Sequence, residues 1–286
     1  MKNIIFIMGA GRSGTTLLSR MLGSVNGLIN VGEALKYLHN QDFQNRNIPC
    51  GCGKTIAECE YWQNVLKKLN LENISEKNRT LQAGSFIKLL LGISNNKLME
   101  ITEDYKIFFS ILNNGESIIV DASKSPSIAL ILKKQSDYPV TILHLIRNPI
   151  DVIASWGESN DYLKKKSFTT AYLTWLSRNI RAILLKSIYP TIVIDFKDLI
   201  NNPVKVFKKI GMDTKLNEIF IDQENISLSQ QHSIAGNPVK LNSGFIKLRQ
   251  NRKDLNRFYK FIVYITLFPL YLLIITIFRK DKSSNI

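Results

Sequence analysis

The chain has 286 residues, of which 45% are hydrophobic and 21% are charged, and this composition argues against a disordered or fibrous protein. Its net charge of +15 at pH 7 favours nucleic acid, acidic lipid or a small molecule with several phosphate-type charges as a partner. The lysines are spread in small groups, for example Lys67-Lys68 and Lys164 to Lys166, which is typical of a solvated basic surface. We therefore expect no nucleic-acid partner.

The first predicted element is a buried strand, "IIFIM", which leads directly into "GAGRSGTTLLSRML". Gly9 and Gly14 have the spacing of an ATP-binding loop, but Thr15 stands where that loop requires lysine, and Arg12 is its only cation. Backbone N–H groups and the start of a helix still hold one phosphate, so we predict a phosphate site without triphosphate chemistry. A glycine turn that only packs a helix remains the alternative.

The three cysteines, Cys50, Cys52 and Cys59, lie close together in "CGCGKTIAECEYW". This small odd number argues against a disulfide-stapled secreted protein. Three thiolates with a fourth ligand could hold zinc, and His39 is the nearest histidine in the sequence. The C-x-C-x6-C spacing lacks the paired cysteines of zinc ribbons, so we expect no metal.

Four short β-branched runs alternate with helical stretches, which predicts an α/β fold with an open, mostly parallel sheet and helices on both faces. These runs are residues 4–8, 117–121, 140–146 and 191–196. The periodicity of "FTTAYLTWL" predicts an amphipathic helix, and a second helix should have Asn202 as N-cap, Pro203 in its first turn and Gly211 after its end. Residues 60–115 should form a helical insertion over the acceptor side. Ligands should bind at the carboxyl ends of the strands.

A second anion site is predicted in "LHLIRNPIDVIASW". Arg147 follows the end of a strand, a helix should begin at Asn148 or Pro149, and Ser155 should lie about two turns along it. Arginine binds phosphate through two parallel hydrogen bonds, and serine adds a hydroxyl donor. Two phosphate sites on one sheet indicate a nucleotide with phosphates at both ends.

Together, "GRSGTT" and "RNPIDVIAS" resemble the 5′-phosphosulfate loop and the 3′-phosphate motif of sulfotransferases that use 3′-phosphoadenosine 5′-phosphosulfate (PAPS), and we expect them at opposite ends of the sheet. The segments "CGCGKTIAECEYW", "VDASKSP" and "HSIAGNPVKLNSGFIKL" resemble the bacterial branch of that family, so the resemblance runs from Gly9 to about residue 260. It implies a P-loop-like fold and transfer of a sulfuryl group from PAPS to an acceptor hydroxyl, without a metal.

The resemblance also implies roles for individual residues. Arg12 would contact the sulfuryl group, and Arg147 and Ser155 would hold the 3′-phosphate. Lys240 would be a second 3′-phosphate contact, although a solvated loop lysine is equally consistent with the sequence. The predicted cofactor-binding residues are Gly11, Arg12, Ser13, Gly14, Thr15, Thr16, Arg147, Ser155 and Lys240.

The general base is assigned to Glu33, because related tyrosylprotein sulfotransferases use a glutamate in a similar Gly-Glu context. Lys124 resembles the lysine that heparan-type sulfotransferases place beside the transferring group, and we expect it to act as an electrostatic helper. Glu33 as an acid at a helix N-terminus is the alternative. His232 is a competing base, whereas His39 is a weaker candidate and His144 should be a core histidine bonded to the backbone.

The predicted organisation is one α/β domain over residues 1–257 and a hydrophobic helix with a basic tail over residues 258–286. The eighteen residues Phe261 to Phe278 carry no charge, which just reaches the length of a membrane span. A core helix kinked or broken at Pro269 and a helix in the membrane interface are the alternatives. The short N-terminal apolar run is unlike a signal peptide, so we expect a cytoplasmic enzyme, with membrane association through residues 258–286 left open.

Saccharide, lipid and peptide hydroxyls all remain open as acceptors, and a membrane-associated C-terminus would favour a lipid-linked or envelope glycan. Two rival functions also remain. A P-loop kinase-like phosphotransferase shares the first loop but needs a lysine and magnesium ligands. A basic, membrane-associated protein without enzymatic activity explains the charge but not the arginine–serine pair.

Overall fold

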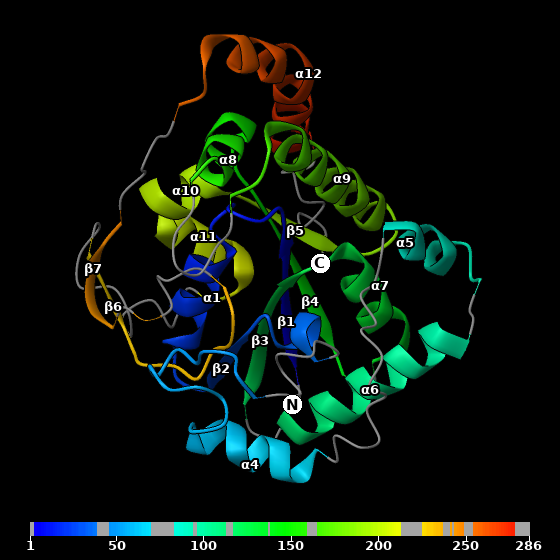
Figure 1. The fold of residues 1–286 in the computed structure, drawn as a ribbon, viewed down its shortest axis with the longest axis vertical. Helices are drawn as coiled ribbons and strands as arrows, with labels where there is room; N and C mark the ends of the chain where they lie inside the picture. The colour runs from blue at the N-terminus through cyan, green and yellow to red at the C-terminus, as the bar shows by residue number, and fades with distance from the viewer. Residues whose placement is uncertain are drawn as a thin grey trace.

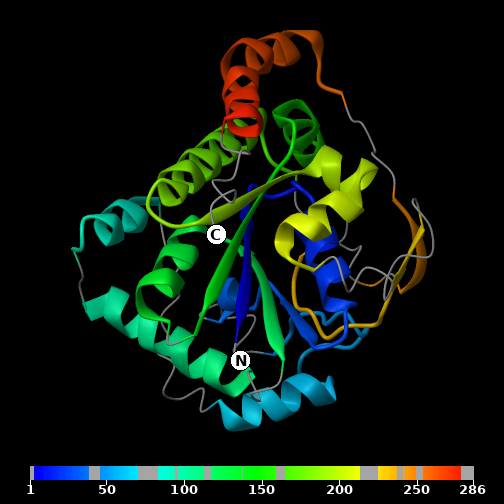
Figure 2. The same ribbon diagram turned by 180° about the vertical axis from the view of Figure 1, so that it is seen from behind.

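The computed structural model describes residues 3–38, 46–69, 83–93, 96–112, 117–136, 138–158, 165–212, 225–236, 241, 243–248 and 254–277. Lys240 and His39, two residues considered above, lie outside these described residues. Figure 1 shows a central twisted sheet with helices on both sides, and Figure 2 shows the same layers from behind. The predicted α/β fold class is confirmed.

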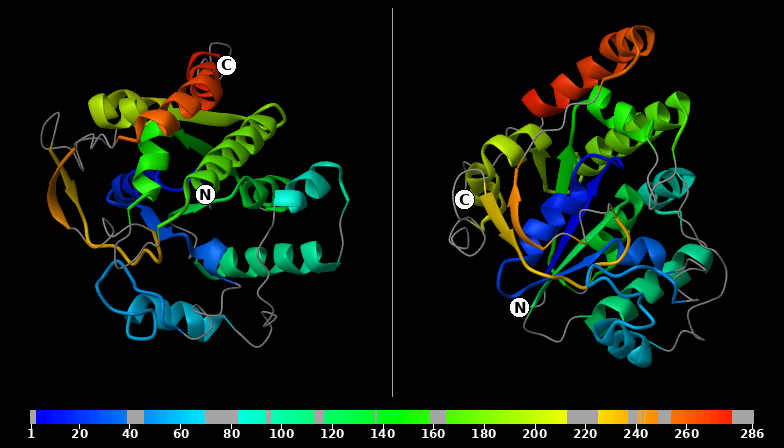
Figure 3. Two further views of the ribbon diagram at one scale, coloured as in Figure 1. Left: turned by 45° about the horizontal axis from the view of Figure 1, so that its top comes forward. Right: turned by 60° about the vertical axis from the view of Figure 1, so that its left-hand side comes forward.

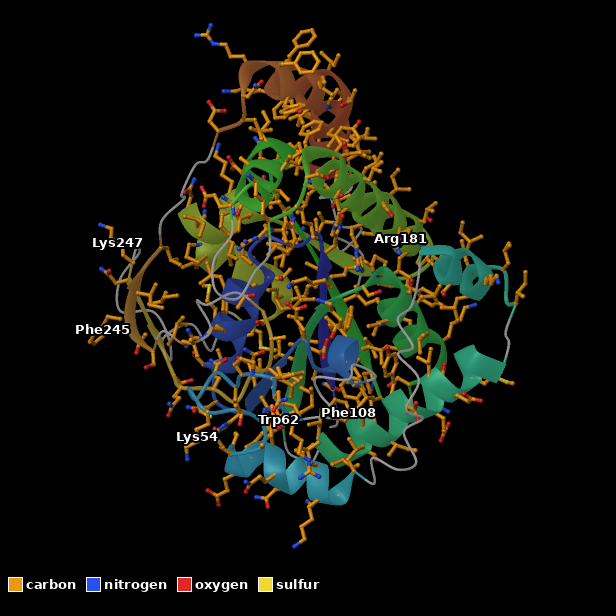
Figure 4. The ribbon with its side chains drawn as sticks, in the orientation of Figure 1. Lys54, Trp62, Phe108, Arg181, Phe245 and Lys247 are labelled. Atoms are coloured by element: carbon orange, nitrogen blue, oxygen red, sulfur yellow. The ribbon has the colours of Figure 1, made fainter. Side chains whose placement is uncertain are left out.

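Five strands form one sheet in the order β2-β3-β1-β4-β5, and every neighbouring pair is parallel. A separate antiparallel pair, β6 and β7, lies at the left edge of Figure 1, and in Figure 4 Phe245 and Lys247 project outward from it. The strands are β1 (Ile4–Gly9), β2 (Leu28–Gly32), β3 (Ile118–Lys124), β4 (Val140–Ile146), β5 (Thr191–Asp195), β6 (Asn225–Leu228) and β7 (Gly244–Lys247).

The helices connect these strands and cover both faces of the sheet (Figures 1 and 2). They are α1 (Thr15–Gly23), α2 (Ala34–Tyr37), α4 (Glu60–Lys68), α5 (Ala83–Leu90), α6 (Asn96–Leu112), α7 (Pro126–Gln135), α8 (Pro149–Trp156), α9 (Phe168–Lys186), α10 (Phe196–Asn201), α11 (Pro203–Ile210) and α12 (Arg257–Thr276).

Strand β1 shows why the sequence produces two buried faces. Its residues are apolar without interruption, and successive side chains of a strand point to opposite faces. Ile4, Phe6 and Met8 pack with residues of α4, α6 and α7, whereas Ile5 and Ile7 pack with residues of α1, α10 and α11. The sheet is therefore buried on both sides and leaves only its ends for a ligand.

The chain order around β1 determines which end is used. From β1 the chain passes through α1 to β2 on one side, and after β3 it crosses to β4 on the other side. In open α/β sheets, ligands bind outside the carboxyl ends of the strands at such a change of direction. The loop that follows β1 lies at this position.

The predicted caps of α11 are confirmed, because the side chain of Asn202 accepts a hydrogen bond from the N–H of Lys205 and Gly211 adopts φ 75° after the helix end. The periodicity of "FTTAYLTWL" is likewise part of a helix, α9, which is longer than that segment. Strand β2 was not predicted, because its central residue is a polar one, Asn30. The structure buries this amide against Gln231.

The C-terminal apolar segment forms one helix, α12, which continues through Pro269. Figure 3 shows it lying over α8 and α9, and one stripe of its side chains enters the core between them. That stripe is Val263, Leu267, Tyr271 and Ile274. The opposite face is exposed, with Phe258 66% and Phe261 63% accessible. Helix α12 is long and apolar enough to cross a membrane, and 22% of its most apolar window is buried in the protein.

Candidate active site

Loops after four neighbouring strands bring the predicted site residues to one end of the sheet. Arg12 follows β1, Glu33 follows β2, Lys124 is the last residue of β3 and Arg147 follows β4. Because all these strands are parallel, their carboxyl ends meet at the same edge. The edge therefore carries three cations and one carboxylate drawn from distant parts of the chain.

The loop after β1 depends on its glycines. Gly14 caps α1 with φ 96°, a conformation that residues with a side chain rarely adopt. A Cβ atom on Gly14 would lie 2.4 Å from the ring of Phe196, and one on Gly11 would lie 2.5 Å from the ring of Trp156. These contacts hold the loop backbone against two aromatic rings, so the loop has one defined shape.

Two polar groups of this loop are buried without a hydrogen-bond partner among the described residues: Nε of Arg12 and Oγ of Ser13. Arg12 also has φ 70°, and its guanidinium carbon lies 5.1 Å from the centre of the Trp156 ring. Leaving buried donors unsatisfied costs about 1–3 kcal/mol each in the absence of water or a ligand. Donors without protein partners at a helix N-terminus fit an anion such as phosphate.

Thr15 and Thr16 begin α1, with Thr15 buried and Thr16 half-buried. A Cβ atom on Gly236 would approach Oγ1 of Thr16 to 3.1 Å and Oε1 of Glu33 to 3.8 Å. The segment around Gly236 therefore lies between the start of α1 and the carboxylate, although it comes more than 200 residues later in the chain.

The guanidinium of Arg147 is held in place by three contacts, and its carbonyl by a fourth. Its Nη1 donates to the carbonyl of Arg12 at 3.3 Å, its Nε lies 3.7 Å from Oδ2 of Asp151, and its guanidinium carbon lies 4.5 Å from the centre of the Phe196 ring. Its carbonyl accepts a hydrogen bond from Nε1 of Trp175. Burial lowers the pKa of Arg147, and the carboxylate of Asp151 acts in the opposite direction.

The two predicted phosphate motifs are neighbours, which corrects the expectation that they lie at opposite ends of the sheet. Strands β1 and β4 are hydrogen-bonded along their length, so the ends that carry the two motifs lie side by side. Helix α8 begins at Pro149, one of the two predicted starts, with Asn148 as its N-cap, and Ser155 is half-buried in its last turn. The hydroxyl of Ser155 makes no hydrogen bond to another described residue.

Glu33 is buried, with 3% of its surface exposed, and lies between two ammonium groups. Its Oε2 accepts from Nζ of Lys36 at 2.9 Å, and its Oε1 accepts from Nζ of Lys124. Burial alone raises the pKa of Glu33, but the charges and hydrogen bonds of Lys124 and Lys36 outweigh it and lower the pKa to about 2. The carboxylate is therefore firmly ionised in this arrangement.

Strands β2 and β3 position this ion pair. The carboxylate of Asp121 in β3 accepts hydrogen bonds from the N–H groups of Leu35 and Ser123. The register of β3 against β1 shifts near its end, and Lys124 adopts φ 66° there. A left-handed conformation is uncommon for a residue with a side chain, and such residues concentrate at functional sites.

Two further cations, Lys166 and Arg178, belong to the same edge and, like Lys36, were not among the predicted site residues. Nζ of Lys166 lies 3.9 Å from the centre of the Trp156 ring, and Nη1 of Arg178 donates to the carbonyl of Lys124. Burial lowers the pKa of Lys166, and neighbouring cations lower it further. We call the five interacting cations the cation cluster: Arg12, Lys36, Lys124, Lys166 and Arg178.

The interpretation of Lys164 to Lys166 as solvated surface is thus incorrect for Lys166, which is half-buried. The sequence feature that points to this role is the tryptophan in "SW" at the end of the second motif, because the ammonium of Lys166 lies over the ring of Trp156. The cluster carries five positive charges, and three of its cations, Lys36, Lys124 and Arg178, interact with the carboxylate of Glu33. Such a site attracts a small polyanion and stabilises negative charge that develops on it.

The histidines occupy other places. His144 is a core residue as predicted, but its Nε2 bonds to the side-chain oxygen of Asn179 at 2.9 Å and not to the backbone, and burial lowers its pKa to about 4. The Nδ1 atom of His232 faces the sulfurs of Cys50 and Cys59. His232 thus has a different environment from the one a general base at the cation cluster requires.

The chain is similar to known proteins at two levels. In solved structures it resembles the sulfotransferase domain of the Synechococcus PCC 7002 olefin synthase (19% identity, 78% of this chain and 78% of that chain, TM-score 0.44). It also resembles the sulfotransferase domain from the curacin biosynthetic pathway (15% identity, 93% of this chain and 97% of that chain, TM-score 0.47). A third similar structure is a sulfotransferase from Mycobacterium avium (13% identity, 74% of this chain and 64% of that chain, TM-score 0.42). None of the curated proteins matches the chain.

A family model gives the stronger result, because its match does not depend on these distant structural likenesses. The model described as "Sulfotransferase family" matches residues 4–212, which include the loop after β1, Glu33, Lys124 and the β4–α8 motif. The match spans well over half of the 286 residues. The chain therefore belongs to the sulfotransferase family.

Proposed function

We propose that this protein transfers a sulfuryl group from PAPS to an acceptor hydroxyl and releases adenosine 3′,5′-bisphosphate. The observation that carries the proposal is the cation cluster, which lies at the end of the sheet beside the glycine loop and Arg147. The donor is a nucleotide with negative charge at two places. The site offers anion-binding groups directly after two adjacent strands, β1 and β4.

In this proposal the loop holds the 5′-phosphate. The backbone N–H groups at the start of α1 and the hydroxyls of Ser13, Thr15 and Thr16 donate to its oxygens. The buried Oγ of Ser13, which has no partner among the described residues, supports this role. Arg147 and Ser155 bind the 3′-phosphate, and Asp151 and the Phe196 ring orient the Arg147 guanidinium for two parallel hydrogen bonds. Lys240 stays a proposed second contact.

The transfer step forms a bond between the acceptor oxygen and sulfur while the bond between sulfur and the bridging oxygen breaks. Negative charge grows on that bridging oxygen, and the bisphosphate leaves with it. Arg12 and Lys124 are proposed to stabilise this charge, which fixed cations do without reorganising during the reaction. This chain's own cations supply the neutralisation that a metal ion supplies in phosphoryl transfer.

Glu33 is proposed to accept the proton of the acceptor hydroxyl. A carboxylate with a pKa of about 2 is a weak base, so the ion pairs seen here oppose this role. Binding of the anionic donor would draw Lys124 toward the sulfuryl group and away from Glu33. Loss of that ion pair raises the pKa of Glu33, because burial raises this pKa and only Lys36 would then act against it. The base would thus be released only when the donor is bound.

Titration calorimetry with adenosine 3′,5′-bisphosphate and with magnesium-ATP tests the donor assignment. We expect selective binding of the bisphosphate, and a loss of at least tenfold in affinity for Arg147→Ala, since hydrogen bonds to charged groups contribute about 1.5–3 kcal/mol. Arg181→Ala is the matched control, because this arginine bonds to Ser177 within α9. Preference for ATP would favour the kinase-like alternative, and full affinity of Arg147→Ala would remove the 3′-phosphate assignment.

The acceptor is proposed to be a glycan or a lipid-linked glycan, because the exposed face of α12 suits a membrane surface. That face carries large apolar side chains, and Arg257 and Lys260 stand at its N-terminal end. Such a helix lies in the interface of an anionic bilayer, with its other stripe docked on the protein. The enzyme would then be cytoplasmic and associated with the membrane through this helix. We also propose that the chain consists of one α/β domain over residues 1–257 and a C-terminal helix with a basic tail over residues 258–286.

Co-sedimentation with vesicles that contain anionic lipid tests this membrane contact. The double variant Phe258→Ser and Phe261→Ser changes only exposed positions and should release the protein from the vesicles. Met99→Ser is the control, since this side chain is 53% exposed on α6, far from α12 in Figure 1. Equal binding of the double variant and the unaltered protein would refute the contact.

A further inference from the structure

Three cysteines and one histidine converge outside the cation cluster. Sγ of Cys50, Cys52 and Cys59 and a ring nitrogen of His232 all lie within 4.8 Å of one another. Cys50 and Cys59 are buried, Cys52 is half-buried and His232 is at the surface. All three cysteines are free thiols, so no disulfide accounts for their proximity.

The separations among Sγ of Cys50, Sγ of Cys59 and Nδ1 of His232 are close to the edges of a tetrahedral metal site. With Zn–S bonds of about 2.3 Å and Zn–N bonds of about 2.0 Å, tetrahedral angles put two sulfurs about 3.8 Å apart and a sulfur and a nitrogen about 3.5 Å apart. Sγ of Cys50 and Cys59 are separated by 3.7 Å. Nδ1 of His232 lies 4.0 Å from Sγ of Cys50 and 3.1 Å from Sγ of Cys59, values that bracket the expected distance.

We propose that Cys50, Cys52, Cys59 and His232 bind one structural Zn²⁺ ion. Three thiolates and one imidazole are a typical closed donor set for zinc, and soft sulfur ligands select zinc over magnesium or calcium. Four protein ligands leave no open position for a water or a substrate, so the ion is structural and takes no part in the reaction. Such an ion would be bound whichever donor and acceptor the enzyme uses.

The backbone around the cysteines is already shaped for such a site. Residues 50–54 form a tight turn in which the N–H of Cys50 donates to the carbonyl of Lys54 at 2.7 Å and Gly53 adopts φ 90°. Cys59 then stands at the N-cap of α4. The turn and the helix start thus present three sulfurs toward the same point.

The proposed fourth ligand, His232, is held in position by two aromatic residues of α4. The ring of His232 stacks on Tyr61 with centroids 5.2 Å apart, and its carbonyl accepts a hydrogen bond from Nε1 of Trp62 at 2.6 Å. In Figure 4, Trp62 lies inside beside Phe108, whereas Lys54 points outward from the turn. Groups that orient a ligand in this way contribute to metal affinity.

The site joins two segments that are far apart in the sequence, since His232 lies 173 residues after Cys59. The residues next to His232 reach the sheet edge that carries the cation cluster, which we call the active edge. Ile234 forms bridges with Gly32 and Cys50, and its carbonyl accepts a hydrogen bond from the N–H of Glu33 at 3.0 Å. A metal ion here would therefore hold the segment that fixes the backbone of Glu33 and faces Thr16 through Gly236. The zinc site would stabilise the active edge from outside.

The first experiment measures metal in the unaltered full-length chain purified under reducing conditions. We expect about one zinc per chain by plasma mass spectrometry. After removal of zinc with a chelator, the chain should take up Co²⁺ with the visible absorption bands of tetrahedral cobalt–thiolate coordination, and added Zn²⁺ should abolish these bands. The melting temperature should fall on chelation and recover with Zn²⁺.

Variants assign the ligands. Cys52→Ser and His232→Asn should each lose the cobalt bands and most of the zinc, whereas Lys54→Ala, an exposed change in the same turn, should keep both. Should a variant fail to fold, the measurements on the unaltered chain still decide the question. A chain that contains no zinc and gives no cobalt bands would overturn the proposal. So would a Cys50–Cys59 disulfide in the native protein, or iron in place of zinc.

Discussion

The buried ion pair of Glu33 allows a quantitative prediction about stability. Replacing Glu33 by Gln keeps the shape of the side chain but removes its charge, and Lys124 loses its counterion in a buried place. The pKa of Glu33 is lowered from 4.5 to about 2 by its partners, which corresponds to about 3 kcal/mol of stabilisation at neutral pH. We therefore expect Glu33→Gln to reduce the free energy of unfolding by about 3 kcal/mol at pH 7.

The pH dependence follows from the direction of the pKa change. A carboxyl group whose pKa is lower in the folded state stabilises that state fully above its unfolded pKa, here 4.5. The stabilisation is lost as the pH falls from 4.5 toward 2, because the unfolded chain takes up the proton first. The difference between the unaltered chain and Glu33→Gln should thus be constant between pH 6 and pH 7 and shrink below pH 4.5.

Urea denaturation of both proteins at several pH values measures this difference. Glu103→Gln is the control, because Glu103 forms an exposed pair with Lys106 at 3.7 Å. Exposed pairs of this kind contribute little, so the control should change the unfolding free energy by less than about 0.5 kcal/mol. Equal stability of Glu33→Gln and the unaltered chain at pH 7, or a difference that does not change with pH, would refute the reasoning.

Three further substitutions test other parts of the structure. Gly14→Ala should abolish bisphosphate binding in calorimetry, because the new Cβ would meet the ring of Phe196 at 2.4 Å and the residue needs φ 96°; retained affinity would contradict the loop assignment. Tyr271→Phe should lower stability by about 1.5–3 kcal/mol in urea denaturation, because its hydroxyl donates to buried Oδ2 of Asp195 at 2.9 Å; an unchanged midpoint would contradict this role. Lys166→Ala should weaken bisphosphate binding about tenfold and reduce its dependence on salt, because one cation leaves the cation cluster; unaltered affinity would place Lys166 outside the site.

The features that could be predicted from the sequence are those in which the determining residues are contiguous. The strand–glycine–helix unit at Gly9 to Leu22 and the strand–arginine–helix unit around Arg147 each contain their own turn and cap residues. The caps of α11 also come from adjacent residues. In these cases local backbone preferences and hydrophobic periodicity suffice, because no distant partner changes the outcome.

Other features arise only when distant segments meet. The pKa of Glu33 depends on Lys124, which lies 91 residues away and reaches it because β2 and β3 pair in parallel. Lys166 and Arg178 resemble other surface cations in the sequence, and only the packing of α9 and Trp156 brings them to the cation cluster.

The cysteines illustrate the same limit, because their spacing alone led to the expectation of no metal. The nearest histidine in the sequence is His39, whereas the structure places His232 beside the sulfurs. Likewise, the uncharged run from Phe261 to Phe278 predicts an apolar helix, whereas the stripe of that helix that is buried depends on its packing against α8 and α9. Periodicity determines the local conformation of a segment. The segments that pack against it depend on the order of strands in the sheet and on the path of the connecting chain, and no local sequence pattern encodes these.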